Sequence, residues 1–170
     1  MKITSNVKLG IVAGLINSIA WYAFAKKLGF YTREVYLYNN YVAFFLLISG
    51  VFLSIYLKKR SDNGILEFKD ALKTGLLYSL VFAIVLAVFN YIYYTIITPD
   101  TIDYFLSEAK THMENDTRIK KEDIPKYLES VRTEYSSLRL FPRFLMFGLI
   151  SSLLAGLILQ KKGPTAFSAN

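Results

Sequence analysis

The sequence has no cysteine and only one histidine, His112, among its 170 residues. Without cysteine the chain has neither a disulfide framework nor a thiolate metal site. A single histidine without a clustered partner is far more often a solvated side chain than a metal ligand or a general base. The motifs of phosphate-binding loops, serine hydrolases and zinc proteases are also missing. We therefore predict no enzymatic activity, no cofactor and no metal.

Charged residues are scarce, at 19% of the chain, and they are unevenly distributed. Four stretches contain no Asp, Glu, Lys or Arg: Leu9 to Ala25, Val35 to Leu57, Thr74 to Pro99 and Phe144 to Gln160. Each approaches or exceeds the roughly 20 residues that an α-helix needs to cross a hydrocarbon core about 30 Å thick. Buried helices of a soluble bundle are the weaker alternative because such helices usually keep a polar face, and Leu80 to Phe89 has none.

The fold class that follows is an all-α polytopic membrane protein. We predict a single membrane domain over residues 1–170, with spans at about 9–25, 36–57, 74–97 and 141–160, and an extramembrane helical insertion at 99–140. Two amphipathic patterns in the insertion, separated by Glu114 to Arg118, predict a helical hairpin. The hairpin would fold back on itself or lie on the ends of the spans.

The first span also has features of a cleaved signal peptide. Lysines precede its apolar run, and Ala23-Phe24-Ala25 has the small-x-small spacing of a cleavage site. However, Lys26 and Lys27 would directly follow the cut, where positive charge hinders translocation, so a retained span is the favoured interpretation.

The distribution of charge predicts an orientation. Four spans place both termini and the connector between spans two and three on one side of the membrane. That side holds Lys2, Lys8, Lys58, Lys59, Arg60, Lys69, Lys73, Lys161 and Lys162. The long segment on the other side counts little in the positive-inside rule, so both termini are predicted to be cytoplasmic. Trp21, Tyr22, Tyr36, Tyr38, Tyr41, Tyr91, Tyr93 and Tyr94 are then expected at the opposite membrane boundary.

Small residues recur every fourth position in three of the spans. The members are Gly10, Gly14 and Ser18 in the first, Gly75, Ser79, Ala83 and Ala87 in the third, and Gly148, Ser152 and Gly156 in the fourth. Such a stripe makes a shallow groove that lets another backbone approach closely, and helices in lipid associate through this kind of packing. We predict that the stripes are contacts between helices of the bundle, with contact to a second copy as the alternative.

Strongly polar residues are few inside the spans, which contain no carboxylate and no histidine side chain. Proton-coupled carriers usually place such a group inside the bundle, so that class is not expected. Asn17 and Asn90 are the main polar residues at these depths, and we predict that they bond across helices rather than contact a solute. Arg143 can snorkel to lipid phosphate at the start of the fourth span.

Two segments carry a resemblance to a known family: FKDALKTG, Phe68 to Gly75, and FNYIYYTIITPD, Phe89 to Asp100. With them the chain resembles a bacterial family of small four-span membrane proteins catalogued only as a domain of unknown function. The resemblance would extend from Gly10 through the fourth span. It implies an inner-membrane location and carries over no activity, cofactor or catalytic residue.

Two classes of function fit these observations. The first is a non-enzymatic membrane protein in the lipid bilayer that interacts with a membrane-protein partner, a second copy as a homo-oligomer, or lipid. The alternative is a small-solute or lipid transporter or channel subunit, lined by Asn17, Asn90 and hydroxyl side chains. Nucleic acid is not an expected partner, because no basic stretch outside the spans is interleaved with aromatic residues.

Overall fold

The structure is a computed structural model that describes residues 3–116 and 118–161. Four helices are long: α1 (Ile3–Leu28), α2 (Arg33–Ser61), α3 (Phe68–Ile92) and α6 (Ser137–Leu159). A π-helical turn, η1 (Tyr93–Ile97), continues α3. Two shorter helices follow, α4 (Thr101–Asn115) and α5 (Ile124–Glu134), with a 3-10 turn, η2 (Lys121–Asp123), leading into α5.

Four helices, with η1 extending α3, are long and apolar enough to cross a membrane. The protein is therefore a multi-pass membrane protein. The prediction of an all-α fold with four spans and a helical hairpin between spans three and four is confirmed.

Each long helix begins before the apolar stretch that the sequence marks out, and α1 and α2 also end after it. α2, for example, runs from Arg33 to Ser61, whereas the predicted span covers about 36–57. Lys and Arg are good helix formers, and their long side chains reach toward polar head groups. A helix therefore does not have to end where the hydrocarbon ends. A stretch without charged residues predicts the part of the helix inside the hydrocarbon, and it does not predict where the helix begins or ends.

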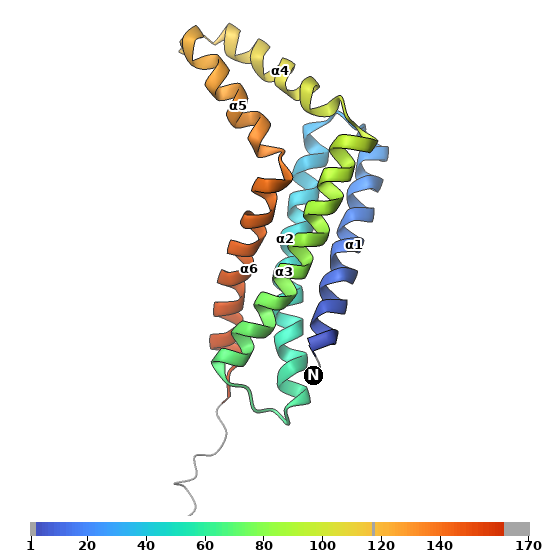
Figure 1. The fold of residues 1–170 in the computed structure, drawn as a ribbon, viewed down its shortest axis with the longest axis vertical. Coiled ribbons are helices and arrows are strands. Elements are labelled where there is room, and N and C mark those ends of the chain that lie inside the picture. The colour runs from blue at the N-terminus through green and yellow to red at the C-terminus, as the bar shows by residue number, and fades with distance from the viewer. Residues whose placement is uncertain (1–2, 117, 162–170) are drawn as a thin grey trace, which may run out of the picture.

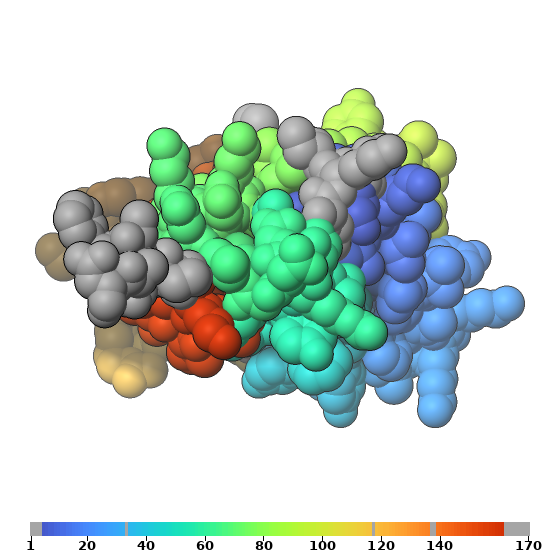
Figure 2. Space-filling view, turned by 90° about the horizontal axis from the view of Figure 1, so that it is seen from below, coloured from blue at the N-terminus to red at the C-terminus, as the bar shows by residue number. Residues whose placement is uncertain are grey.

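The four long helices form a bundle in which α2 and α3 lie between α1 and α6. α3 packs most extensively against α6 and also contacts α1 and α2, while α2 contacts α1 and α6. Seen end on, α1 and α6 occupy opposite sides of the molecule (Figure 2). α3 is therefore the central helix, and Tyr78, Phe82 and Leu86 on it are almost fully buried.

The outward faces of the bundle are apolar. Ile19, Met146 and Ile158 are 70%, 64% and 68% exposed, respectively. A soluble protein rarely exposes so many large apolar side chains together, whereas hydrocarbon covers such a surface without cost. The apolar faces of the helices thus point outward, toward lipid. Close packing rather than hydrophobicity therefore decides which helix surfaces contact each other.

α4 and α5 project beyond one end of the bundle as an antiparallel pair (Figure 1). They contact each other, and α5 turns into α6 with little further contact. The beginning of α1, the α2–α3 connector and the end of α6 lie at the opposite end of the molecule (Figure 1). There, Leu66 and Lys161 exchange two backbone hydrogen bonds of 2.9 Å, which fasten the connector to the end of α6.

Candidate functional site

The most extensive helix contact in the bundle joins α3 to α6. Gly75, Ser79, Gly148 and Ser152 lie in it and are here called the α3–α6 contact. A Cβ atom added to Gly75 would overlap Ser152, and one added to Gly148 would overlap Ser79. Each glycine thus faces a serine of the antiparallel partner helix. The two stripes interlock because the glycine of one helix leaves the space that the serine of the other fills.

The serine hydroxyls of this contact are satisfied within their own helices. Ser79 Oγ donates to the Gly75 carbonyl at 2.8 Å, and Ser152 Oγ donates to the Gly148 carbonyl at 2.6 Å. This back-bonding leaves no hydroxyl donor unpaired in an apolar contact, where an unmade hydrogen bond would be costly. Gly156 continues the line, with its Cβ position 3.1 Å from Phe68 and 3.5 Å from Ala71 Cβ.

The stripe on α1 is used differently. Cβ positions at Gly10 and Gly14 would meet Val81, at 3.0 Å, and Val85, at 2.7 Å from its Cβ, both on α3. Branched valine side chains therefore fill the groove on α1, and Ser18 at its end is buried with its hydroxyl on the Gly14 carbonyl at 2.9 Å. On α3, Ala83 is buried in the core and Ala87 is half-buried.

Tyr78 is an inter-helix contact that the sequence analysis missed. Its hydroxyl donates to the Leu46 carbonyl on α2 at 2.8 Å, and a Cβ at Gly50 would overlap the tyrosine ring. Gly50 thus makes room for a hydrogen bond between two spans. This hydrogen bond could have been predicted from the position of Tyr78 in the middle of an apolar stretch, because a buried phenol at that depth needs a hydrogen-bond acceptor.

Asn17 and Asn39 form a hydrogen bond between α1 and α2. Asn17 Nδ2 donates to Asn39 Oδ1 at 2.8 Å, and both residues are buried. Asn39 lies near the beginning of α2, and the rotation of this helix turns its side chain into the bundle. Asn90 is also buried, on α3. Passage of a solute along these amides stays a prediction.

Aromatic side chains join the bundle to the hairpin. The cluster, here called the aromatic collar, consists of Trp21, Phe89, Tyr93, Tyr94, Phe105 and Tyr135. Tyr135, at the end of α5, packs edge-on against Tyr94 at 5.8 Å and stacks on Phe105 of α4 at 5.2 Å between ring centroids. The collar therefore fixes the base of the hairpin to the end of α3.

The collar also divides the aromatic residues that were expected at the membrane boundary. Trp21, Tyr93 and Tyr94 are buried in protein contacts, whereas Tyr41 and Tyr91 are 70% and 61% exposed. Only the exposed group can act as a lipid-facing belt. Sequence position alone does not separate the two groups, since the helix rotation decides which ring points inward.

Arg143 contacts protein groups at the foot of the hairpin. Its Nη1 donates to the Tyr36 hydroxyl at 3.1 Å, and its Nη2 lies 3.8 Å from a Glu134 carboxylate oxygen. The side chain is 30% exposed. The guanidinium therefore links α6 to α2 and to the end of α5, in addition to lying near the depth predicted for snorkelling.

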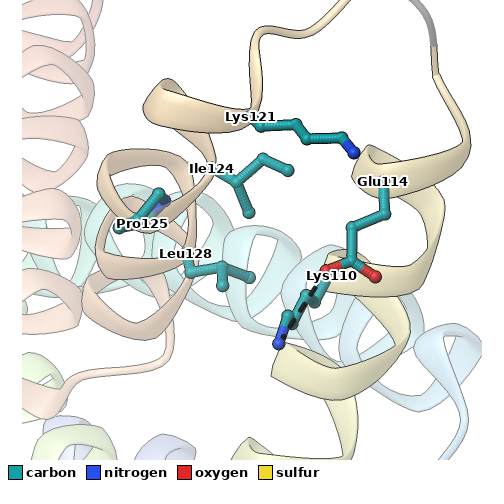
Figure 3. A pocket seen from close by; sticks show the side chains of 6 residues that line it. All are labelled: Lys110, Glu114, Lys121, Ile124, Pro125 and Leu128. Carbon is teal, nitrogen blue, oxygen red and sulfur yellow. Dashed lines mark ion pairs between the residues drawn. The ribbon is translucent and has the colours of Figure 1, made fainter.

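A hollow of about 480 Å³ lies between α4 and α5, in the half of the hairpin away from the collar (Figure 3). Its lining residues, here called the hairpin hollow, are Lys110, Glu114, Lys121, Ile124, Pro125 and Leu128. Ile124, Pro125 and Leu128 give it an apolar side, while the Lys110–Glu114 ion pair, at 3.8 Å, and Lys121 give it a charged side. This combination suits an apolar group that carries a polar or charged end.

The turn beyond the hollow is held by Asp116. Its carboxylate accepts hydrogen bonds from the Arg118 backbone N–H at 3.0 Å and from Nε and Nη2 of the same arginine at 2.9 and 2.8 Å. These bonds stabilise the charged form and hold the pKa of Asp116 below its ordinary value of 3.8. The interaction is exposed, so we assign it a local role in the turn.

Neither the hairpin nor the bundle assembles a metal centre from the residues that the structure describes, where no group of three or more His, Cys, Asp or Glu side chains is brought together. His112 lies exposed on α4. The polar features available for function are therefore the hairpin hollow, the charged groups at the foot of the hairpin, and the amides inside the bundle.

The chain belongs to the DUF4199 family, described as a protein of unknown function, whose model matches residues 8–161. The resemblance drawn from the sequence is thereby confirmed. Comparison with curated proteins finds no match, and comparison with solved structures finds none either.

Proposed function

We propose that this protein is a non-enzymatic membrane protein whose four-helix bundle holds the α4–α5 hairpin at one membrane surface for contact with a partner protein. The hairpin hollow is the observation that carries the proposal. It lies beyond the aromatic collar, in a part of the chain that contributes little to holding the bundle together.

The composition of the hollow supports a protein as the partner. Anchor side chains at protein interfaces are typically apolar or aromatic and enter a pocket with polar groups at its edge. Ile124 and Leu128 offer the apolar surface, and Lys110, Glu114 and Lys121 offer charges of both signs. Exposed Tyr104 and Tyr127, at 47% and 50%, enlarge the surface that a partner could cover.

Site-specific photo-crosslinking in native membranes tests this proposal. A photo-reactive residue at Tyr127 on the hairpin should give a discrete adduct with another protein. The same residue at Tyr56, which is exposed on α2 within a span, is the control and should give none. An adduct that consists of two copies of this chain would identify a homo-oligomer instead, and no adduct at Tyr127 would contradict the proposal.

Charge reversal in the hollow makes the test specific. Lys110→Glu combined with Lys121→Glu should weaken the Tyr127 adduct, because both lysines line the hollow. Lys126→Glu with Lys120→Glu changes the net charge of the hairpin equally from positions outside the hollow lining, and it should leave the adduct intact.

We also propose a bacterial inner-membrane location with both termini cytoplasmic. The lysines and arginines at the end of the bundle opposite the hairpin support it. The absence of native cysteine makes a labelling test clean. His112→Cys should react with a membrane-impermeant maleimide in intact cells, whereas Lys69→Cys should react only after permeabilisation. The reverse pattern would overturn the orientation.

A further inference from the structure

A second hollow, of about 590 Å³, lies at the corner where α5 turns into α6. Its lining residues, here called the arginine niche, are Glu129, Arg132, Thr133, Ser136, Arg139 and Pro142. Those on α5 recur at helical spacing and share one face of that helix. The niche is separate from the hairpin hollow, whose lining residues are different.

The niche lies at the depth of lipid head groups. Arg139 is the first residue of the candidate span Arg139–Leu159, which has 21 residues. At about 1.5 Å per residue this span is roughly 30 Å long, the thickness of the hydrocarbon core, so its first residue lies at the polar boundary. Arg139 and Pro142 therefore lie at the depth at which a lipid head group can reach them from the side.

The charge of the niche favours a ligand with one net negative charge. Two arginines and one glutamate line it, a net charge of +1. Arg132 also lies 3.7 Å from Asp103, but the two side chains are 59% and 79% exposed, and such a pair is weak in water. Arg143 is engaged with Tyr36 and Glu134, so Arg132 and Arg139 are the guanidinium groups that face the hollow.

An apolar surface leads from the niche into the membrane along α6. Met146, Ile150, Leu153 and Leu157 follow Arg139 and Pro142 at intervals of three or four residues, so they share one helix face. Their side chains are 64%, 48%, 37% and 58% exposed. An acyl chain can lie along this face while the head group occupies the niche.

We propose that the arginine niche binds the phosphate of an anionic phospholipid, with the acyl chains along the exposed face of α6. Arginine is suited to this ligand because its planar guanidinium donates two parallel hydrogen bonds to phosphate oxygens. The Glu129 carboxylate also lines the niche and can accept hydrogen bonds from hydroxyl groups of the head group, while the Thr133 hydroxyl, which donates to the Glu129 carbonyl at 2.7 Å, can act there as an acceptor. The proposal is independent of the partner proposed for the hairpin hollow.

Lipid binding to the purified full-length protein tests the proposal. In nanodiscs of phosphatidylcholine, a fluorescent phosphatidylglycerol should bind, and unlabelled phosphatidylglycerol should displace it far better than phosphatidylcholine does. Inorganic phosphate at the same concentration should not displace it. Equal displacement by the two lipids would overturn the proposal, and so would displacement by inorganic phosphate, which would identify a simple anion site.

A pair of matched variants assigns the effect to the niche. Arg132→Gln with Arg139→Gln should weaken phosphatidylglycerol binding about tenfold, the loss expected when charge-assisted contacts are removed. Lys120→Gln with Lys126→Gln removes the same charge from the hairpin outside the niche and should change binding less than twofold. Equal loss in the two variants would show nonspecific attraction to charge and contradict the proposal. The wild-type lipid comparison remains decisive if either variant folds poorly.

Discussion

The bundle and the hairpin of this protein hold their helices together by different means. In the bundle, glycine faces serine across the α3–α6 contact, while large apolar side chains such as Ile19 and Ile158 point outward. In the hairpin, apolar residues such as Phe105 and Ile124 point inward and charged residues cover the outside. The difference follows from the solvent. Burying a leucine gains almost no free energy when the surrounding solvent is hydrocarbon, so steric fit decides the packing of the bundle. In water the burial of each apolar side chain is favourable.

The two regions also differ in how well they tolerate substitutions without a loss of stability. Small residues at a close helix crossing cannot be replaced by larger ones, because the neighbouring helix leaves no room for a larger side chain. An amphipathic pair joined by a turn tolerates change at its exposed positions. The bundle should thus be sensitive to single added methyl groups, and the hairpin should be sensitive mainly at the aromatic collar.

The largest expected effect comes from Gly75→Leu in the α3–α6 contact. The added side chain would overlap Ser152 and force α3 and α6 apart, at a cost of about 3 kcal/mol in the free energy of unfolding. Reversible unfolding in bicelles measures this. Ser49→Leu is the control, since Ser49 is exposed on α2, and it should change stability by less than about 0.5 kcal/mol. Equal stability of the two variants would contradict the claim that a small residue is needed at the helix contact and not at the lipid-facing surface.

The buried amide pair should give the next largest effect. Asn17→Leu removes the hydrogen bond to Asn39 and leaves that amide in an apolar contact, at a cost of about 1 kcal/mol. Asn39→Leu should cost a similar amount. The double variant should lose less than the sum of the single losses, because no orphaned amide is left. Strictly additive losses in a double-mutant cycle would contradict the coupling.

Removal of the distal hairpin should have a smaller effect on the bundle. Replacing residues 107–130 by a short Gly-Ser linker keeps Phe105 and Tyr135 of the collar and deletes the hairpin hollow. The unfolding free energy of the bundle should change by less than about 1 kcal/mol, because the deleted part packs mainly on itself. A collapse of the bundle would show that the two regions are not separable.

Acidification should have the smallest effect, and we expect to see it at the hairpin turn. The pKa of Asp116 is held below 3.8 by Arg118, so the stabilisation is present above that value and is lost as pH falls through the lower, folded pKa. Protease cleavage at the turn should therefore stay constant from neutral pH down to about pH 4 and rise below it. Asp116→Asn should abolish this dependence. A change between pH 7 and pH 5 in the wild type would point to another group.

The sequence by itself determined the solvent, the number of spans and the hairpin. Long stretches without charge, such as Thr74 to Pro99, require hydrocarbon, and the amphipathic period after Pro99 requires an interface with water. These properties are local, since each depends on residues within one helix. The spacing of Gly75, Ser79, Gly148 and Ser152 also shows locally that a backbone can come close.

Only the tertiary structure decided which surfaces meet. It places Gly75 opposite Ser152, turns Asn39 toward Asn17, and brings the Tyr78 hydroxyl to the Leu46 carbonyl across 32 residues of sequence. It also brings Arg132 and Arg139 to one hollow. These pairings depend on the rotation and crossing of whole helices. In lipid, hydrophobicity does not distinguish one rotation from another, so the choice falls to steric fit among all the helices at once.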